Sequence, residues 1–302
     1  MIALLAPGQG SQTPGMLAEW LELPGAADQI ARWSDISGLD LARLGTTATA
    51  DEITDTAVTQ PLVVAATLLA NAELTNRGLL AGRQTVVAGH SVGEIAAYAI
   101  AGVITPDDAV RLAAVRGAEM AKACAVEPTG MSAVLGGDEA EVLARLEALD
   151  LIPANRNAAG QIVAAGAIAA LEKLAEDPPA KARVRPLATA GAFHTGYMAS
   201  ALDGYAAAAA EVATAEPTTT LLSNSDGRAV TSGQDAMTKL VAQLTRPVRW
   251  DLCTETMRQL NTTAIVEFPP AGALTGIARR ELRGVATHAI KAPADLDGLA
   301  DL

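Results

Sequence analysis

The sequence contains few aromatic residues and little positive charge. Phe, Trp and Tyr make up only 3% of its 302 residues, so the core must be built mainly from the small aliphatic side chains of Ala, Leu and Val. Lys and Arg number 22 against 34 Asp and Glu, which gives a formal net charge of −12. Binding to nucleic acid or to an anionic membrane surface calls for a basic patch, so this balance argues against both partners. A small anionic substrate held by one Arg remains compatible with it.

Cysteine and long apolar runs are also scarce. Cys124 and Cys253 are the only cysteines and match no metal-ligand spacing, so we expect no metal site and a reduced, cytoplasmic protein. The longest unbroken apolar run, Ile95 to Ile104, is too short to span a bilayer. No basic residue precedes Arg32, so we expect no secretory signal.

Strand-like and helix-like segments alternate along most of the chain. The apolar run at 2–6 and the β-branched run at 84–89 predict buried strands. Thr105 as a cap and Pro106 at the first helical position predict a helix that ends near residue 124. Pro61 is placed to begin a second helix. Further strands are expected at 218–224, 263–268 and 285–290, and helices at 233–244, 250–260 and 272–282.

The order of elements changes from about residue 126. Strand, helix, strand, strand, helix and strand are predicted in that order between Gly130 and Thr189, which is the split βαβ, ferredoxin-like arrangement. The whole therefore predicts an α/β protein with a mainly parallel sheet. Residues 1–126 and 191–302 would form the larger domain, and 127–190 a small inserted one.

The segment Gly89-His90-Ser91-Val92-Gly93 lies between a predicted strand and a predicted helix. It fits G-x-S-x-G, in which a nucleophilic serine occupies a sharp turn between glycines. Ser91 followed three residues later by Glu94 also predicts a capping box at the start of a helix. The local pattern leaves nucleophile and simple helix cap about equally favoured.

A nucleophilic serine needs a base, and the chain has three histidines. His194 is the best candidate, because it lies in a glycine-containing connection of the kind that displays catalytic groups. His90 adjoins Ser91, and adjacent side chains at a tight turn diverge, whereas His288 lies in a predicted strand. On the residues alone, a purely structural role for His194 in its loop is as well supported as catalysis.

Two further features could bind a ligand. Arg116 lies in mid-helix among apolar neighbours, where an Arg either extends its charged end to water at the core edge or holds an anion such as a carboxylate. The first is the commoner case. The loop at 6–12, APGQGSQ, lacks the spacing of a phosphate-binding loop, but it follows a strand at the sheet edge where α/β folds bind ligands.

Seven motifs together resemble, in order, the malonyl-CoA:acyl carrier protein transacylases of fatty acid synthesis and their relatives, the acyltransferase domains of polyketide synthases. They extend over nearly the whole chain: PGQGSQ, GHSVGEIAAYAIAGV, RGAEM, GMSAVLG, NAAGQIVAAG, AFHT and QLTRPVRW. The resemblance implies an α/β-hydrolase-like core that carries a ferredoxin-like subdomain. It also implies a Ser-His dyad, with Ser91 as nucleophile and His194 as base, and a backbone carbonyl near Gln243 that orients the histidine.

The resemblance implies substrate-binding groups as well. Arg116 would pair with the free carboxylate of malonate, which reverses the preference reached from its neighbours. The backbone amides of Gln9 and Val92 would bind the oxyanion. Asn157 and Met131 match family positions near the cleft between the subdomains.

The implied reaction is a ping-pong transfer of the malonyl group from malonyl-CoA to the phosphopantetheine thiol of acyl carrier protein. Malonyl-CoA is then a substrate, no cofactor is bound, and the protein is expected to be a monomer. Phe193 favours malonyl over methylmalonyl. A serine hydrolase, a transferase of another acyl group in polyketide synthesis and a non-catalytic carrier-binding module are the alternatives. Acyl carrier proteins are acidic, so docking needs a local basic patch. The densest basic groups are Arg279, Arg280 and Arg283, and Lys181, Arg183 and Arg185, although a solvated surface is the commoner role of such groups.

Overall fold

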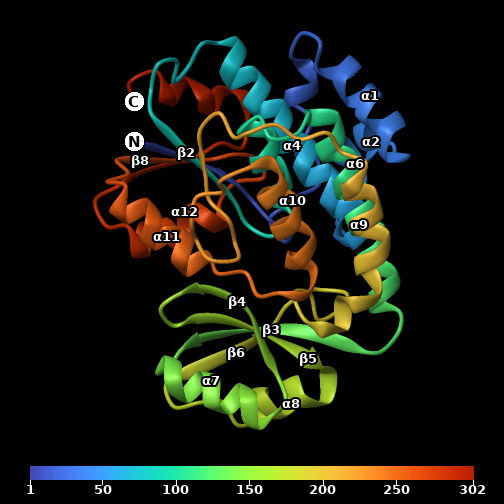
Figure 1. The fold of residues 1–302 in the computed structure, drawn as a ribbon, viewed down its shortest axis with the longest axis vertical. Helices are drawn as coiled ribbons and strands as arrows, with labels where there is room; N and C mark the ends of the chain where they lie inside the picture. Colours follow the sequence, from blue (N-terminus) through green and yellow to red (C-terminus); the bar gives the residue numbers. More distant parts are fainter.

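Two separate sheets organise the computed structural model, which describes residues 1–302 (Figure 1). One is a five-stranded parallel sheet with the strand order β7-β2-β1-β8-β9, and the other is a four-stranded antiparallel sheet with the order β4-β5-β3-β6. The predicted α/β class with a mainly parallel sheet is confirmed.

The parallel sheet is built from short apolar strands: β1 (Ile2–Ala6), β2 (Thr85–Gly89), β7 (Thr220–Leu221), β8 (Ala264–Glu267) and β9 (Ala286–Ala289). Every residue of the central strand β1 is buried, as expected for a parallel strand covered by helices on both faces. Alternate side chains of β1 point to opposite sides, so Leu4 packs in the larger apolar cluster and Leu5 in a second one.

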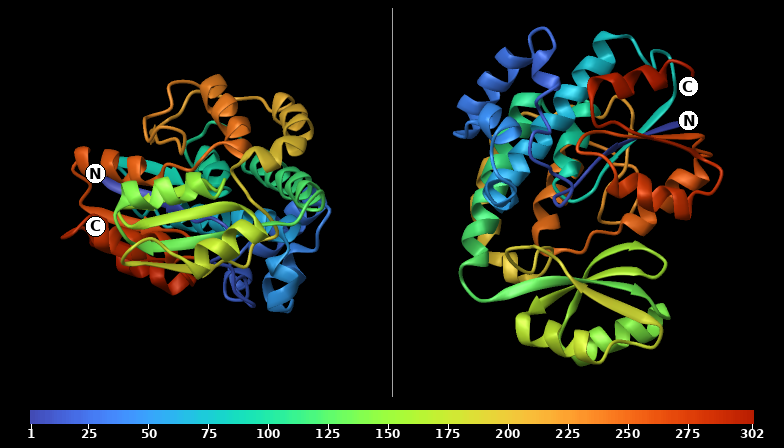
Figure 2. Two further views of the ribbon diagram at one scale, coloured as in Figure 1. Left: turned by 90° about the horizontal axis from the view of Figure 1, so that it is seen from below. Right: turned by 180° about the vertical axis from the view of Figure 1, so that it is seen from behind.

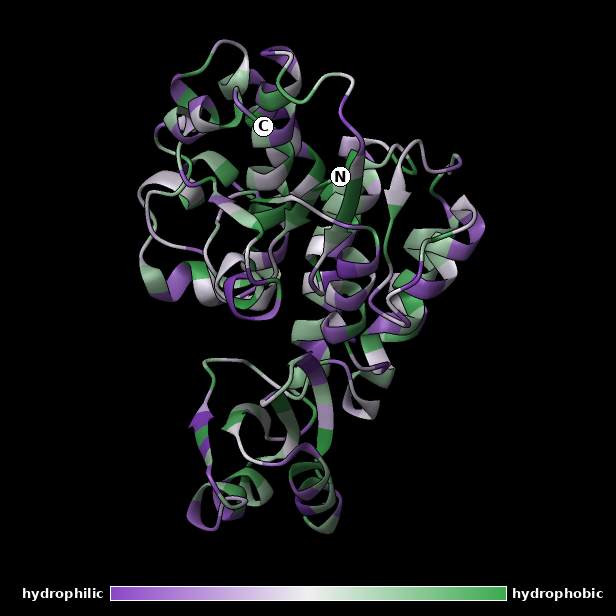
Figure 3. Ribbon diagram, turned by 90° about the vertical axis from the view of Figure 1, so that its left-hand side faces the viewer, coloured by the Kyte–Doolittle hydropathy of each residue, from purple (hydrophilic) through white to green (hydrophobic).

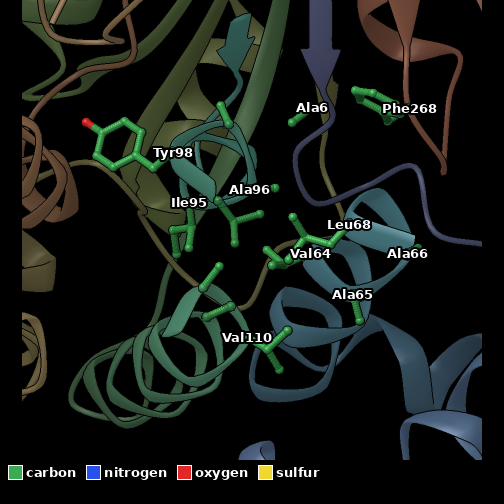
Figure 4. Packing of buried hydrophobic residues seen from close by; sticks show 14 of the residues in the cluster. Ala6, Val64, Ala65, Ala66, Leu68, Ile95, Ala96, Tyr98, Val110 and Phe268 are labelled. Carbon is green, nitrogen blue, oxygen red and sulfur yellow. The ribbon is translucent and has the colours of Figure 1, made fainter. Parts of the chain in front are cut away.

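Helices from different parts of the chain cover the two faces of this sheet. On one side lie α4 (Thr56–Asn76), α5 (Gly93–Ile100) and α6 (Pro106–Cys124), and on the other α11 (Trp250–Gln259) and α12 (Ala273–Glu281). Figure 4 shows the small aliphatic side chains where α4, α5 and α6 meet. The remaining helices of the larger part are α1 (Ala26–Ser37), α2 (Leu41–Thr46), α3 (Ala50–Thr54), α9 (Leu202–Ala210) and α10 (Gly233–Ala242).

Most of the predicted elements are present with shifted ends. The cap at Thr105 and the first helical position of Pro106 are confirmed. The prediction that Pro61 begins a helix is wrong, because α4 already starts at Thr56 and contains Pro61. The side chain of Asp55 accepts the backbone N–H of Ala57 and fixes that earlier start. The strand expected at 218–224 is reduced to the two residues of β7.

Helix α4 has the length and apolar composition of a membrane-spanning helix, but 72% of its apolar window is buried inside the fold. Along the whole chain, apolar residues concentrate in the strands and in the helix faces that pack on them, and hydrophilic residues lie mostly on the outer faces (Figure 3). Helix α4 is thus a core element.

The antiparallel sheet contains β3 (Thr129–Gly136), β4 (Ile152–Ala158), β5 (Gln161–Ala167) and β6 (Ala182–Pro186). Helices α7 (Glu139–Ala148) and α8 (Ile168–Glu176) cover the face that points away from the parallel sheet (Figure 2). The opposite face contributes Met131 to the larger apolar cluster. Two backbone hydrogen bonds join the two parts: the N–H of Arg156 donates to the carbonyl oxygen of Val248, and the N–H of Val248 donates to the carbonyl oxygen of Ala154, each at 2.9 Å.

Candidate active site

Ser91 occupies the sharp turn that joins β2 to α5. Its φ of 54° lies in the left-handed region that non-glycine residues rarely adopt. The flanking glycines are required by close backbone approaches. A Cβ on Gly89 would lie 2.0 Å from the carbonyl oxygen of Gly93, and a Cβ on Gly93 would lie 2.3 Å from the carbonyl oxygen of Ala6. The G-x-S-x-G pattern is therefore a strained turn at the carboxyl end of a strand.

The capping box predicted for Ser91 and Glu94 is absent. The N-cap of α5 is Val92, without a side-chain cap bond, and the helix begins at Gly93. A capping residue needs extended backbone angles, and the left-handed φ of Ser91 turns its side chain elsewhere. Its Oγ lies 2.7 Å from Nε2 of His194 instead.

His194 is held by a backbone carbonyl group. Its Nδ1 donates to the carbonyl oxygen of Gln243 at 2.8 Å, which leaves the lone pair of Nε2 to accept the hydroxyl proton of Ser91. Burial, the positive charge of Arg116 and a smaller effect of His90 lower the pKa of His194 to about 3, against the opposing effect of the bond to Gln243. The ring is thus neutral, as a base must be, near neutral pH.

Arg116 is buried with only 1% of its surface exposed. The prediction that the Arg116 side chain extends to water at the core edge is wrong, because its guanidinium donates hydrogen bonds to neighbouring buried amide groups. Its Nη1 donates to Oε1 of Gln60 at 2.7 Å and its Nη2 to Oε1 of Gln243 at 2.8 Å. The same Nη2 lies 3.5 Å from Oγ of Ser91. These partners are neutral oxygens, so a buried positive charge lies beside the serine without a paired carboxylate.

Glu94 and Asn224 connect these groups. Oε1 of Glu94 accepts the backbone N–H of Asn224 at 2.7 Å, and Oε2 accepts Nε2 of Gln243 at 2.6 Å. The side chain of Asn224 bonds the backbone on both sides of His90. Burial raises the pKa of Glu94 to about 7, although its hydrogen bonds and the charge of Arg116 act in the opposite direction.

Asn224 and Gln60 were not predicted from the sequence. Each carried a faint signal: Asn224 stands at the end of a predicted strand, at the sheet edge where functional side chains gather, and Gln60 is a polar residue at the start of an apolar helical run. Such positions are common in α/β proteins, so the packing of α4 against α6 was needed to bring Gln60 to Arg116.

The other predicted residues are buried to different degrees. Val92 is 1% exposed, and Gln9 is half-buried with its side chain 3.3 Å from Oγ1 of Thr56. Oδ1 of Asn157 lies 2.8 Å from Nε2 of His90, whereas Oγ of Ser91 is bonded to His194. Met131 is buried in the larger apolar cluster. No three His, Cys, Asp or Glu side chains are grouped so as to hold a metal ion.

The acyl transferase domain family matches residues 4–294. The chain belongs to the acyl transferase family. It is 76% identical over 302 residues to a malonyl CoA-acyl carrier protein transacylase of Mycobacterium tuberculosis, with both chains covered completely. A crystal structure described as that of the Mycobacterium tuberculosis enzyme superposes with a TM-score of 0.98, at 76% identity and 99% coverage of each chain.

A more distant structure of this acyl transferase family adds a partner. It is a malonyl-transacylase in complex with a type II polyketide acyl-carrier protein, 29% identical to this chain, with a TM-score of 0.93 and 99% coverage of both chains. The protein is therefore an acyltransferase, and its relatives are malonyl CoA-acyl carrier protein transacylases.

Proposed function

We propose that this acyltransferase moves the malonyl group of malonyl-CoA to the phosphopantetheine thiol of acyl carrier protein, and so supplies fatty acid chain elongation. Malonyl-CoA is the substrate, not a resident cofactor. Relatives with this activity share up to 76% of its residues over the full length. A thioester suits a serine nucleophile, and the carboxylate of a malonyl group suits one buried cation.

One arrangement carries the proposal. Oγ of Ser91 lies within hydrogen-bond distance of the neutral base His194, and the buried guanidinium of Arg116 lies beside the same oxygen. A serine hydrolase needs the first pair only. A cation without a paired carboxylate, next to the nucleophile, favours an acyl group that brings its own negative charge, as malonyl does.

In the first half-reaction, Nε2 of His194 takes the proton of Ser91 as Oγ attacks the thioester carbonyl carbon. A tetrahedral oxyanion forms. When it collapses, the C–S bond breaks, the CoA sulfur takes the proton from His194, and a malonyl ester remains on Ser91. In the second half-reaction, His194 takes the proton of the carrier thiol and the thiolate attacks the carbonyl carbon of this ester. The bond between that carbon and Oγ of Ser91 then breaks, and Oγ recovers the proton from His194.

The backbone amides of Gln9 and Val92 are the proposed oxyanion donors. The loop with Gln9 follows β1, and the turn with Val92 follows the paired neighbour β2, so both loops leave the same edge of the sheet. The N–H of His90 donates to the carbonyl oxygen of Ala6 at 3.0 Å, which brings the two loops together. A donor placed this way contributes about 3 kcal/mol to stabilising the transition state.

Arg116 would act on the base as well as on the substrate. The positive charge of Arg116 lowers the pKa of His194 in the free protein. A malonyl carboxylate paired with the guanidinium compensates that charge, so His194 becomes a stronger base when the correct acyl group is bound. Acetyl groups lack this charge and leave the base weak.

The finer fold description is also a proposal. The order β4-β5-β3-β6, with helices after β3 and β5, supports a ferredoxin-like subdomain at 127–190, inserted into an α/β-hydrolase-like core of residues 1–126 and 191–302. Asn157 and Met131 lie on strands of this subdomain. They would shape the cleft between the two parts, Asn157 through its bond to His90.

Acyl carrier protein would dock on exposed basic side chains. Arg183 and Arg185 are exposed on the edge strand β6, and Arg279 and Arg280 are exposed on α12. Local positive charge of this kind can offset the repulsion between two acidic proteins. We propose a monomer in the cytoplasm, where fatty acid synthesis would require it.

Intact-mass measurement with malonyl-CoA tests this function. The wild-type chain should gain one malonyl group, lose it when carrier protein is added, and transfer it to the carrier. Ser91→Ala should gain nothing, whereas Ser37→Ala, on the remote helix α1, should behave as wild type. Release of free malonate without acylation of the carrier would show a hydrolase instead.

A further inference from the structure

Asn224 is a completely buried amide side chain next to the nucleophile, with 0% of its surface exposed. All of its polar groups have partners. Its backbone N–H donates to Glu94, and its carbonyl oxygen accepts the N–H of Arg249 at 2.8 Å. Its Nδ2 donates to the carbonyl oxygen of Gly89 at 2.7 Å, and its Oδ1 accepts the N–H of Ser91 at 2.8 Å. No group of this residue is left for a substrate.

The two side-chain bonds replace a missing rung of the parallel sheet. Strand β7 pairs with β2 as far as Leu221 and Val87, and the N–H of Leu222 then donates to the carbonyl oxygen of Val87. A longer strand would next bond the carbonyl oxygen of Gly89 and the N–H of Ser91. The amide of Asn224 bonds both groups instead. One side-chain amide thus makes the two hydrogen bonds that the backbone of a longer β7 would make.

This replacement matters because β2 must end abruptly at Ser91. The residue adopts a left-handed φ of 54°, a conformation that costs free energy and persists only where surrounding bonds fix it. Asn224 holds the backbone on both sides of His90, directly before the strained residue. Its amide therefore fixes the direction in which Oγ of Ser91 points.

Glu94 transmits the same constraint to the other groups of the site. One carboxylate oxygen holds the backbone of Asn224, and the other holds the side chain of Gln243, whose amide also donates to Oδ1 of Asn224 at 3.2 Å. Gln243 in turn accepts a hydrogen bond from Arg116 through its side-chain oxygen and one from His194 through its backbone carbonyl oxygen. Nucleophile, base and cation are thus fixed against one another through Asn224.

We propose that Asn224 is a positioning residue for acyl transfer: it holds Ser91 in line with His194 by completing the β2 ladder with its side-chain amide. The inference rests on the proposed role of Ser91 as nucleophile. The proposed role requires an amide side chain, because the carbonyl oxygen of Gly89 needs a donor and the N–H of Ser91 needs an acceptor. Aspartate at this position lacks the donor when ionised, and leucine lacks both groups.

The test compares Asn224→Asp and Asn224→Leu with Thr67→Val. Thr67 donates to the carbonyl oxygen of Pro269 at 3.0 Å, so its substitution also leaves a buried carbonyl group without a donor, but its side chain is bonded to none of Ser91, His194 and Arg116. Two measurements are made on each protein: the kcat and KM of acylation by malonyl-CoA, and the rate at which an uncharged fluorophosphonate labels Ser91. The kcat and the amount of protein labelled are corrected for the folded fraction.

Both Asn224 variants should lose ~100-fold in kcat and in labelling rate, as for a nucleophile displaced from its base, while KM for malonyl-CoA changes less than about threefold. Thr67→Val should lose neither. Asn224→Asp should also regain activity as the pH is lowered, because a protonated carboxyl group can donate to Gly89 as the amide does. Wild-type labelling should show no such rise.

Activity per folded molecule equal to wild type in Asn224→Leu would overturn the proposal, as would a loss confined to KM. A wild-type protein that reacts with the fluorophosphonate but takes no malonyl group would contradict the proposed function alone. The labelling comparison would then still decide the role of Asn224.

Discussion

Nδ1 of His194 donates a hydrogen bond to the backbone carbonyl oxygen of Gln243, 2.8 Å away, in the place where many serine enzymes have a carboxylate. A carbonyl group carries no full negative charge, so it supports the protonated ring less than a carboxylate would. The result is a base whose pKa is set mainly by burial and by the nearby guanidinium of Arg116.

Replacing Arg116 by Ala should remove the preference for malonyl groups. The carboxylate of malonyl-CoA would lose its buried partner, at a cost of about 3 kcal/mol or ~100-fold in kcat/KM. Acylation by acetyl-CoA should rise relative to malonyl-CoA, because the uncompensated cation is gone. Parallel acylation assays with both thioesters measure this ratio. Unchanged malonyl preference would show that the substrate assignment is wrong.

Gln60→Leu should weaken malonyl binding with little effect on the nucleophile. Gln60 contacts Arg116 through Oε1 and is bonded neither to Ser91 nor to His194. A leucine leaves Nη1 of Arg116 buried without an acceptor and frees the guanidinium to move, which should raise KM for malonyl-CoA roughly tenfold. Fluorophosphonate labelling of Ser91 is the control. An equal loss in labelling would mean that Gln60 supports the whole site.

The pH dependence of Ser91 reactivity should change when Arg116 is removed. The positive charge lowers the pKa of His194, so Arg116→Ala raises it. Labelling requires a neutral histidine, and the decline in rate on acidification should therefore begin at a higher pH in the variant than in the wild type. A pH series of labelling rates measures the shift. Coinciding profiles would contradict coupling between the two groups.

His194 should make the fold less stable in acid. Its pKa is about 3 in the folded protein and near 6.5 in the unfolded chain, so between these values the unfolded state binds more protons. This contribution to the free energy of unfolding falls as the pH decreases from 6.5 towards 3. The free energy of unfolding, measured with urea at several pH values in this range, should depend less steeply on pH in His194→Gln than in the wild type. Identical slopes would exclude a depressed pKa.

Ser91→Gly should be more stable than Ser91→Ala, although both lack the nucleophile. Glycine adopts the φ of 54° without the steric cost that alanine meets. The difference should be about 1 kcal/mol, or roughly 2 °C in melting temperature for a chain of this length. Thermal unfolding of the two inactive proteins compares them. Equal melting temperatures would show that the turn at Ser91 is unstrained.

Local chemistry in the sequence was enough to predict much of the fold. The buried run of β1, the β-branched residues of β2 and the cap at Thr105 each determine a structure over a few neighbouring residues. The same logic failed at Pro61, because Asp55 could cap an earlier start and the helix accommodated the proline. Boundaries depend on competing local signals of similar strength.

The candidate site, too, could be predicted from the sequence only where the signal was local. The sequence by itself determined that a serine stands between two glycines after a strand, and the order of its motifs pointed to Ser91, His194 and Arg116. Only the tertiary structure excluded the capping box, since Ser91 and Glu94 suit one until the backbone turns left-handed. Asn224, Gln60 and Gln243 come from distant segments, and their bonds to Ser91 and Arg116 exist only after the sheet and its covering helices assemble.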